Sequence, residues 1–125
     1  MNQPQLQLVV IYSTQLETIR AFYELLGMTF ARERHGRGPE HFAAQLGELV
    51  FEIYPAPTDD PPANSVRLGF AVASLDRLVE TLVEAGGKLI SEPLDSPWGR
   101  RAVVADPEGR RLELMEARGP KHCCG

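Results

Sequence analysis

A chain of 125 residues is long enough for one domain with its own hydrophobic core. Its net charge of −4 does not suit nonspecific nucleic-acid binding, and no apolar run approaches the roughly 20 residues of a membrane span. Residues 1–10 lack the basic start of a signal peptide, and the two cysteines, Cys123 and Cys124, are adjacent near the chain end. We therefore expect a cytoplasmic protein that contacts neither nucleic acid nor membrane.

The first half of the chain predicts a strand, a helix and three further strands. The apolar stretch LQLVVIY predicts a strand over 6–12, and apolar residues at helical spacing predict a helix over 14–27. Thr14 and Glu17 suggest a capping box at its start, and Gly27 is a stop signal. The three strands that follow are predicted at 28–35, 40–46 and 48–54.

The pattern then starts again after a proline-rich segment. Residues 55–64 hold four prolines and are predicted to be a linker. A strand is predicted over 65–72 and a helix over 74–86, capped by Ser74 and stopped by Gly86. The remaining strands are predicted at 88–93, 100–106 and 110–116, the last two joined by the Asp-Pro-Glu-Gly turn 106–109.

The two halves therefore read as a repeat of one βαβββ unit. The helix caps Thr14 and Ser74 lie 60 residues apart, and Glu52 and Glu113, each in the last strand of its unit, lie 61 apart. We expect an α+β fold whose two modules form a cupped mixed sheet around a cleft, with both glutamates pointing into it. The expected boundaries are module one at 5–54, the linker at 55–64, module two at 65–117 and a flexible tail at 118–125.

Two stretches resemble a known superfamily. "YSTQLETIRAFYELLGM" at 12–28 resembles the opening strand and helix of the vicinal oxygen chelate superfamily, and "SPWGRRAVVADPEGRRLELME" at 96–116 resembles its closing hairpin. This superfamily includes glyoxalase I, extradiol dioxygenases, fosfomycin-resistance enzymes and bleomycin-resistance proteins, and the similarity covers about residues 6–117. The resemblance implies paired βαβββ modules around a pocket, and a homodimer in which modules of two chains can share one pocket.

In the metal-dependent members, the first and last strands of each module supply the metal ligands. Carried over to this sequence, the last-strand positions are Glu52 and Glu113, and the first-strand positions fall on Leu8 and Arg67. Leucine cannot coordinate a metal, and a guanidinium repels a dication. We therefore expect no metal cofactor, with Arg67 paired to Glu52, Glu113 or both. A divalent metal on Glu52 and Glu113, or two solvated glutamates, are the alternatives.

A small-molecule cleft is expected along the faces that carry the two glutamates. Tyr12, Tyr54 and Trp98 could stack on an aromatic or amphiphilic ligand, or they could pack at the rim and anchor a loop. The expected lining residues are Leu8, Val10, Tyr12, Val50, Glu52, Tyr54, Arg67, Trp98, Arg111 and Glu113.

The leading functional hypothesis is a metal-independent small-molecule binding protein of the bleomycin-resistance type. The alternative is a lyase, isomerase or dioxygenase of the same superfamily that uses Glu52 and Glu113 with a divalent metal. A third hypothesis, a metal-free enzyme with one glutamate as general base, is disfavoured by the neighbouring Arg67. The sequence names neither the ligand nor a catalytic residue.

Two smaller features remain open. The tail residues His122, Cys123 and Cys124 suit soft-metal or redox chemistry, or form a disordered end. The basic segment 31–38 is interpreted as a solvated hairpin tip rather than an anion site.

Overall fold

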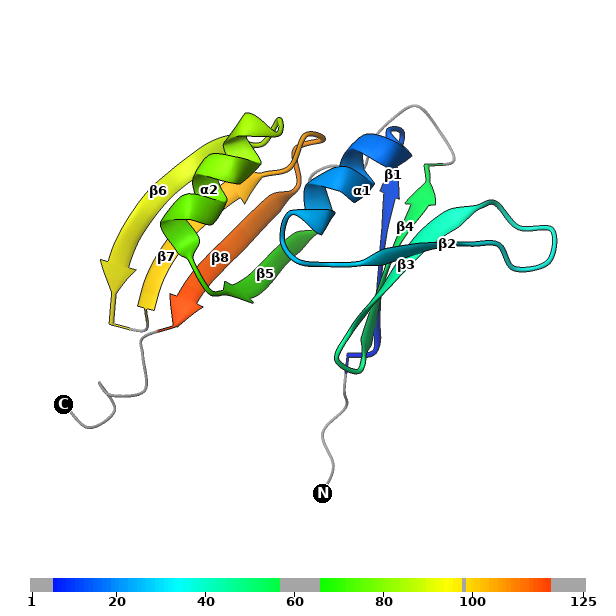
Figure 1. Cartoon of the computed structure of the whole chain (residues 1–125), viewed down its shortest axis with the longest axis horizontal. Coiled ribbons are helices and arrows are strands. Elements are labelled where there is room, and N and C mark those ends of the chain that lie inside the picture. Colours follow the sequence, from blue (N-terminus) through cyan, green and yellow to red (C-terminus); the bar gives the residue numbers. More distant parts are fainter. Residues whose placement is uncertain (1–5, 57–65, 98, 118–125) are drawn as a thin grey trace, which may run out of the picture. The chain divides into compact units, whose positions relative to one another are not determined.

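The computed structural model describes residues 6–56, 66–97 and 99–117, and the chain divides between Pro62 and Ala63 into two compact units. Each unit has one helix and one four-stranded sheet (Figure 1). The predicted α+β fold with two βαβββ modules is therefore confirmed. Neither helix is long and apolar enough to cross a membrane, a finding that covers the described residues.

The first unit follows the predicted order of elements. Its sheet has the strand order β1-β4-β3-β2, in which β1 runs parallel to β4 and the other neighbours are antiparallel. The elements are β1 (Leu8–Ser13), α1 (Leu16–Glu24), β2 (Phe30–Glu33), β3 (His41–Leu46) and β4 (Leu49–Pro55).

The second unit repeats this topology. Its strand order is β5-β8-β7-β6, again with the first and last strands parallel. The elements are β5 (Arg67–Val72), α2 (Leu75–Glu84), β6 (Lys88–Ser96), β7 (Gly99–Ala105) and β8 (Arg111–Ala117). The same order in both units confirms the internal repeat read from the sequence.

Each helix packs on one face of its own sheet. Tyr23 of α1 lies against Phe51 of β4, with 5.3 Å between the ring centroids. In the second unit α2 packs on β6, β7 and β8. Because side chains alternate along a strand, the residues under each helix form the core and their neighbours point to the other face. The buried apolar residues of the two sheets include Ile11, Phe42, Ala44, Phe51, Ile53, Ala102, Val104, Leu112 and Leu114.

The start of α1 differs from the prediction. The N-cap residue is Gln15 rather than Thr14, and the Gln15 side chain makes no capping hydrogen bond. The Gln15 amide instead donates to the Ser13 hydroxyl at 2.8 Å. Glu17 pairs with Arg20 and with Arg32 of β2, so it does not complete a capping box. The predicted box was wrong because these guanidiniums hold the Glu17 carboxylate.

The start of α2 is closed by a residue from the far end of the unit. Ser74 is the N-cap, as predicted, but its side chain makes no capping hydrogen bond. The Leu75 amide donates to the Glu116 carboxylate at 2.8 Å, a contact between residues 41 positions apart. A carboxylate suits this helix end, where unpaired N–H groups carry partial positive charge.

Strands β4 and β6 extend further than predicted, because the prediction ended each of them at or just before a proline. Pro55 belongs to β4 and pairs with Ser13, although it was assigned to the linker. Strand β6 runs beyond the predicted 88–93 to Ser96, with register shifts between Ser91 and Leu94 around Pro93. Strand β6 is an edge strand, where proline and irregular pairing are tolerated, and Pro55 is the last residue of the interior strand β4. The domain boundaries stay predictions, because 57–65 and 118–125 lie outside the described residues.

The predicted turn between β7 and β8 is confirmed and is held by a buried ion pair. The Gly109 amide donates to the Asp106 carbonyl at 2.8 Å, and Gly109 has φ +98°. The Arg110 side chain is 1% exposed and pairs with Asp106 at 2.9 Å and with Glu108 at 3.0 Å. In this turn, the carboxylates of Asp106 and Glu108 therefore both contact the guanidinium of Arg110.

We expect Arg110→Ala to lower the free energy of unfolding by about 3–5 kcal/mol, because it leaves two buried carboxylates without their cation. Urea denaturation followed by circular dichroism measures this loss. Arg77→Ala, which removes an exposed guanidinium from α2, is the matched control and should change stability by less than about 0.5 kcal/mol. Equal losses in the two variants would contradict the structural role of the buried pair.

Candidate functional site

The predicted cleft residues of the first unit share the helix-free face of its sheet. The parallel register between β1 and β4 sets them side by side in pairs. Tyr12 is 43% exposed, and Leu8 is also exposed. The face is thus accessible and partly aromatic. Its pairs are Leu8 with Val50, Val10 with Glu52, and Tyr12 with Tyr54.

The predicted residues of the second unit also share a helix-free face. Arg67 pairs in register with Arg111, and Gly69 pairs with Glu113, so Arg67, Arg111 and Glu113 point to one side. Trp98 lies outside the described residues. That the two helix-free faces enclose a common cleft stays a prediction.

The partner of Glu113 corrects one expectation. Its carboxylate forms an ion pair and a hydrogen bond with Arg101 of β7. Among the described residues, no ion pair joins Glu113 to Arg67. Arg101 reaches Glu113 diagonally across the β7–β8 ladder, whereas Arg67 lies opposite Arg111. The pairing of Arg67 with Glu52, which lies in the other unit, stays a prediction.

Glu52 has a different neighbour, the histidine at the start of β3. His41 is the first residue of β3 and its side chain is 1% exposed. Its ring stacks on Tyr54, with 4.0 Å between centroids and 9° between planes. Its Nε2 atom lies 3.9 Å from Oε2 of Glu52, which is 15% exposed. The lone carboxylate in the apolar β4 strand therefore faces a buried imidazole.

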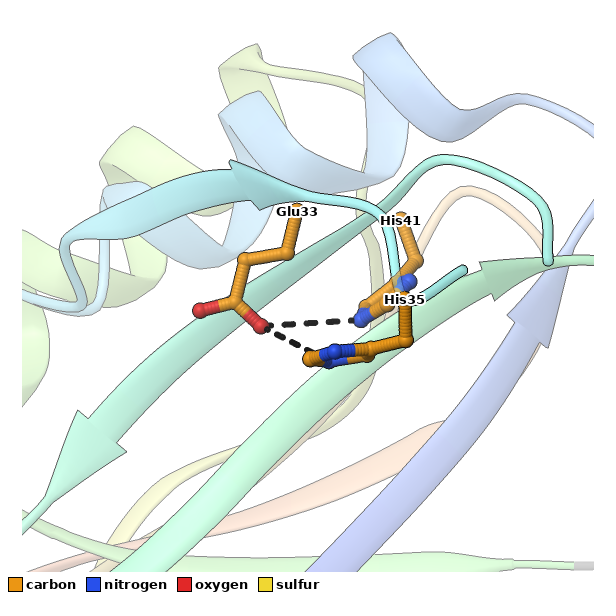
Figure 2. A group of neighbouring side chains, drawn as sticks. All are labelled: Glu33, His35 and His41. Carbon is orange, nitrogen blue, oxygen red and sulfur yellow. Dashed lines mark ion pairs between the residues drawn. The ribbon is translucent and has the colours of Figure 1, made fainter. Parts of the chain in front are cut away.

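Two more potential ligands converge on this imidazole (Figure 2). Oε1 of Glu33, at the end of β2, lies 3.7 Å from Nε2 of His41 and 3.4 Å from Nε2 of His35. The ligand atoms of the three residues lie within 4.8 Å of one another. Within the described part of the chain, this Glu33–His35–His41 cluster is the group that could hold a metal ion.

The tautomer of His41 follows from its second nitrogen. Nδ1 lies 3.2 Å from the Pro39 carbonyl oxygen, which can only accept a hydrogen bond. Nδ1 therefore carries a hydrogen, and the other nitrogen, Nε2, is turned toward carboxylates. Among the described residues, Nε2 is buried and has no hydrogen-bond partner.

The two units differ at one equivalent position. His41 lies two residues before Ala43, which pairs with Glu52, and Arg101 lies two residues before Val103, which pairs with Glu113. The same position on the third strand of each unit thus carries imidazole in one and guanidinium in the other. Across the neighbouring edge strands, Glu33 pairs with His41, whereas Leu94 pairs with Arg101.

Sequence reasoning missed Glu33, His35 and His41 because it searched the first and last strands for ligands. The signal was the hairpin register. Glu33 and His41 flank a turn rich in glycine, and pairing them places both on the helix-free face beside Glu52 and Tyr54.

The aromatic part of this face centres on Tyr54. Its ring lies 6.2 Å from that of Tyr12, with the planes tilted by 52°. Burial raises the pKa of the Tyr54 hydroxyl above its ordinary value, and the nearby Glu52 carboxylate raises it further. Tyr54 therefore stays a neutral hydroxyl up to strongly alkaline pH.

We expect Glu52→Gln to lower the pKa of Tyr54 without restoring the ordinary value, because the charge is removed while burial persists. Titration of the Tyr54 ring carbons by NMR measures this shift. Glu48→Gln, which removes an exposed carboxylate from the β3–β4 turn, should leave the Tyr54 pKa unchanged. An unchanged Tyr54 pKa in Glu52→Gln would contradict the contribution of Glu52.

Comparison with known proteins gives a family match over most of the chain. Residues 5–114 match the family described as the Glyoxalase/Bleomycin resistance protein/Dioxygenase superfamily. An uncharacterized protein of Mycolicibacterium smegmatis is 33% identical over 112 residues, which are 90% of this chain and 93% of that protein.

Two further similarities are partial or structural. The anthracycline biosynthesis protein DnrV of Streptomyces peucetius is 45% identical over 72 residues, or 48% of this chain and 26% of DnrV. The chain therefore matches about a quarter of that longer relative. The crystal structure of TnmS3, an antibiotic binding protein from Streptomyces sp. CB03234, superposes with a TM-score of 0.71 at 21% identity, covering 94% of this chain and 99% of that one. This similarity shows a common fold.

Proposed function

Because the chain belongs to the glyoxalase/bleomycin resistance protein/dioxygenase superfamily, we propose that it binds an aromatic or amphiphilic small molecule on its helix-free sheet faces. The observation that carries this proposal is the aromatic surface of the first sheet. Exposed Tyr12 lies beside Tyr54, which in turn is stacked on His41. Aromatic rings held in this way offer a rigid surface for a flat ligand.

The surroundings of these rings indicate the chemistry of the ligand. Leu8 and Val10 add apolar area on the same face, and Glu52 adds a partly buried carboxylate. A ligand with a planar apolar part and a cationic or hydrogen-bond-donating group would satisfy both. The similarity to TnmS3, an antibiotic binding protein, and to DnrV, an anthracycline biosynthesis protein, supports a ligand of this class.

Binding by the cleft is proposed to be independent of a metal between Glu52 and Glu113. The family resemblance puts Leu8 and Arg67 where metal-dependent members carry ligands, and neither can coordinate. Arg101 already neutralises Glu113. A dication at Glu113 would have to displace or oppose this guanidinium.

The second candidate is a metal-dependent lyase, isomerase or dioxygenase. It is favoured by the carboxylates at both last-strand positions and by a histidine next to Glu52. This class would be favoured if the protein contains stoichiometric metal and removal of the metal abolishes both a catalytic activity and ligand binding.

We also propose that the protein is cytoplasmic and acts as a homodimer. Exposed apolar side chains on the helix-free faces, including Leu8 and Leu94, support self-association, since burial of such residues favours it.

Titration calorimetry of the full chain with an anthracycline tests the binding proposal. We expect saturable binding that a chelator does not abolish, and Tyr12→Ala should weaken it about two- to tenfold by removing a stacking ring. Leu25→Ala is the matched control, because Leu25 is 41% exposed but lies at the end of α1, and it should bind as the unaltered chain does. No binding of anthracyclines or bleomycin, or equal effects of the two substitutions, would count against the proposal.

A further inference from the structure

The Nε2 atom of His41 is buried next to two carboxylates, and a positive charge at this position would be stabilised by both. Its lone pair points toward the carboxylates of Glu33 and Glu52, at 3.7 and 3.9 Å, and carboxylate oxygens only accept hydrogen bonds. Among the described residues, no donor satisfies it. Three acceptors that face one another repel unless a proton or a metal cation lies between them.

The surrounding ligand set favours a metal cation. Glu33, His35 and His41 supply one carboxylate and two imidazoles, which is a ligand combination used for zinc. With metal–ligand bonds of about 2.0–2.1 Å, tetrahedral ligands lie about 3.3–3.4 Å apart. The separations of 3.4 and 3.7 Å from Glu33 to the two imidazoles are close to this value (Figure 2).

The buried imidazole is also oriented as a metal ligand requires. A metal-binding histidine usually donates its other ring nitrogen to a carbonyl or carboxylate, which fixes the tautomer and the ring plane. Nδ1 of His41 lies beside the Pro39 carbonyl at 3.2 Å, and the ring is stacked on Tyr54 at 4.0 Å. Both contacts hold Nε2 toward Glu33 before any ion arrives.

We propose that Glu33, His35 and His41 form a binding site for one zinc-class divalent ion, which fastens the β2–β3 hairpin. Glu33 and His41 form the last pair of the hairpin ladder, and His35 lies in the loop that joins the strands. The ion therefore closes the loop over 34–40. Exposed His35 and the partly exposed Glu33 leave a path for it from solvent.

This site has a different ligand set from the position that the family resemblance gives for a metal, although it adjoins Glu52 of that position. It uses none of Leu8, Arg67 or Glu113 as ligands, and the proposed ligand binding does not require the ion. The second unit lacks the same chemistry, because Arg101 and Leu94 stand where the first unit has His41 and Glu33.

Zinc titration of the tag-free full chain, after dialysis against a chelator, tests the site. We expect one ion bound per chain and a higher melting temperature in its presence. Glu33→Gln and His35→Gln should each weaken zinc binding at least about tenfold and remove the thermal shift. His35 is exposed, so its variant should fold normally, as circular dichroism would show.

Two controls separate this site from other zinc ligands. The double variant Cys123→Ser, Cys124→Ser removes the tail thiols and should still bind one ion. Glu40→Gln removes an exposed carboxylate next to His41 in sequence, one that pairs with Arg32, and should bind zinc as the unaltered chain does. Loss of zinc in the double variant, or unchanged affinity in both Glu33→Gln and His35→Gln, would overturn the proposal.

The remaining outcomes are equally decisive. Absence of saturable zinc binding would reject the site. Anthracycline titrations with and without zinc keep the two proposals apart. Zinc binding without anthracycline binding would reject only the proposed function. Anthracycline binding without zinc binding would reject only the zinc site.

Discussion

The organisation of both units depends on one constraint, which is that a single helix covers only one face of a four-stranded sheet. Alternation along each strand then divides the residues into a buried set under the helix and a second set on the opposite face. Ile11, Phe51 and Ile53 are core residues for this reason, and their neighbours Tyr12, Glu52 and Tyr54 are not. The chemistry of the protein is concentrated on the face that the helix does not use.

The two copies of the unit have become chemically different on that face. Each keeps a glutamate on its last strand. In the second copy, Arg101 neutralises the glutamate directly, and the result is a closed ion pair. In the first copy, the imidazole of His41 occupies the equivalent position, and Glu33 replaces an apolar side chain on the edge strand. A difference at one position on each of two neighbouring strands thus separates a glutamate paired with arginine from the Glu33–His35–His41 cluster.

The sequence predicted what depends on local pattern and repetition. The order of elements, the repeat, the Asp106–Gly109 turn and the shared face of Glu52 and Tyr54 follow from periodicity and turn chemistry, and all are confirmed. It did not predict what depends on pairing between strands. The contact of Glu113 with Arg101 and that of Glu52 with His41 require the register of neighbouring strands, which composition does not set. The capping box of α1 was mispredicted, and the contact of Glu116 at the start of α2 was missed, for a related reason, since Glu17 and Glu116 act through tertiary contacts.

The Glu116 contact has a consequence for the order in which the protein is built during synthesis. The start of α1 is supported by Ser13, two residues before Gln15, so it can form as soon as that segment leaves the ribosome. The start of α2 waits for Glu116, 41 residues after Leu75, and β5 waits for the same strand as its parallel neighbour. Contacts between distant residues form slowly because a long loop must close first. The second unit therefore reaches its native state only after β8 has been made, when the first unit already has all of its strands.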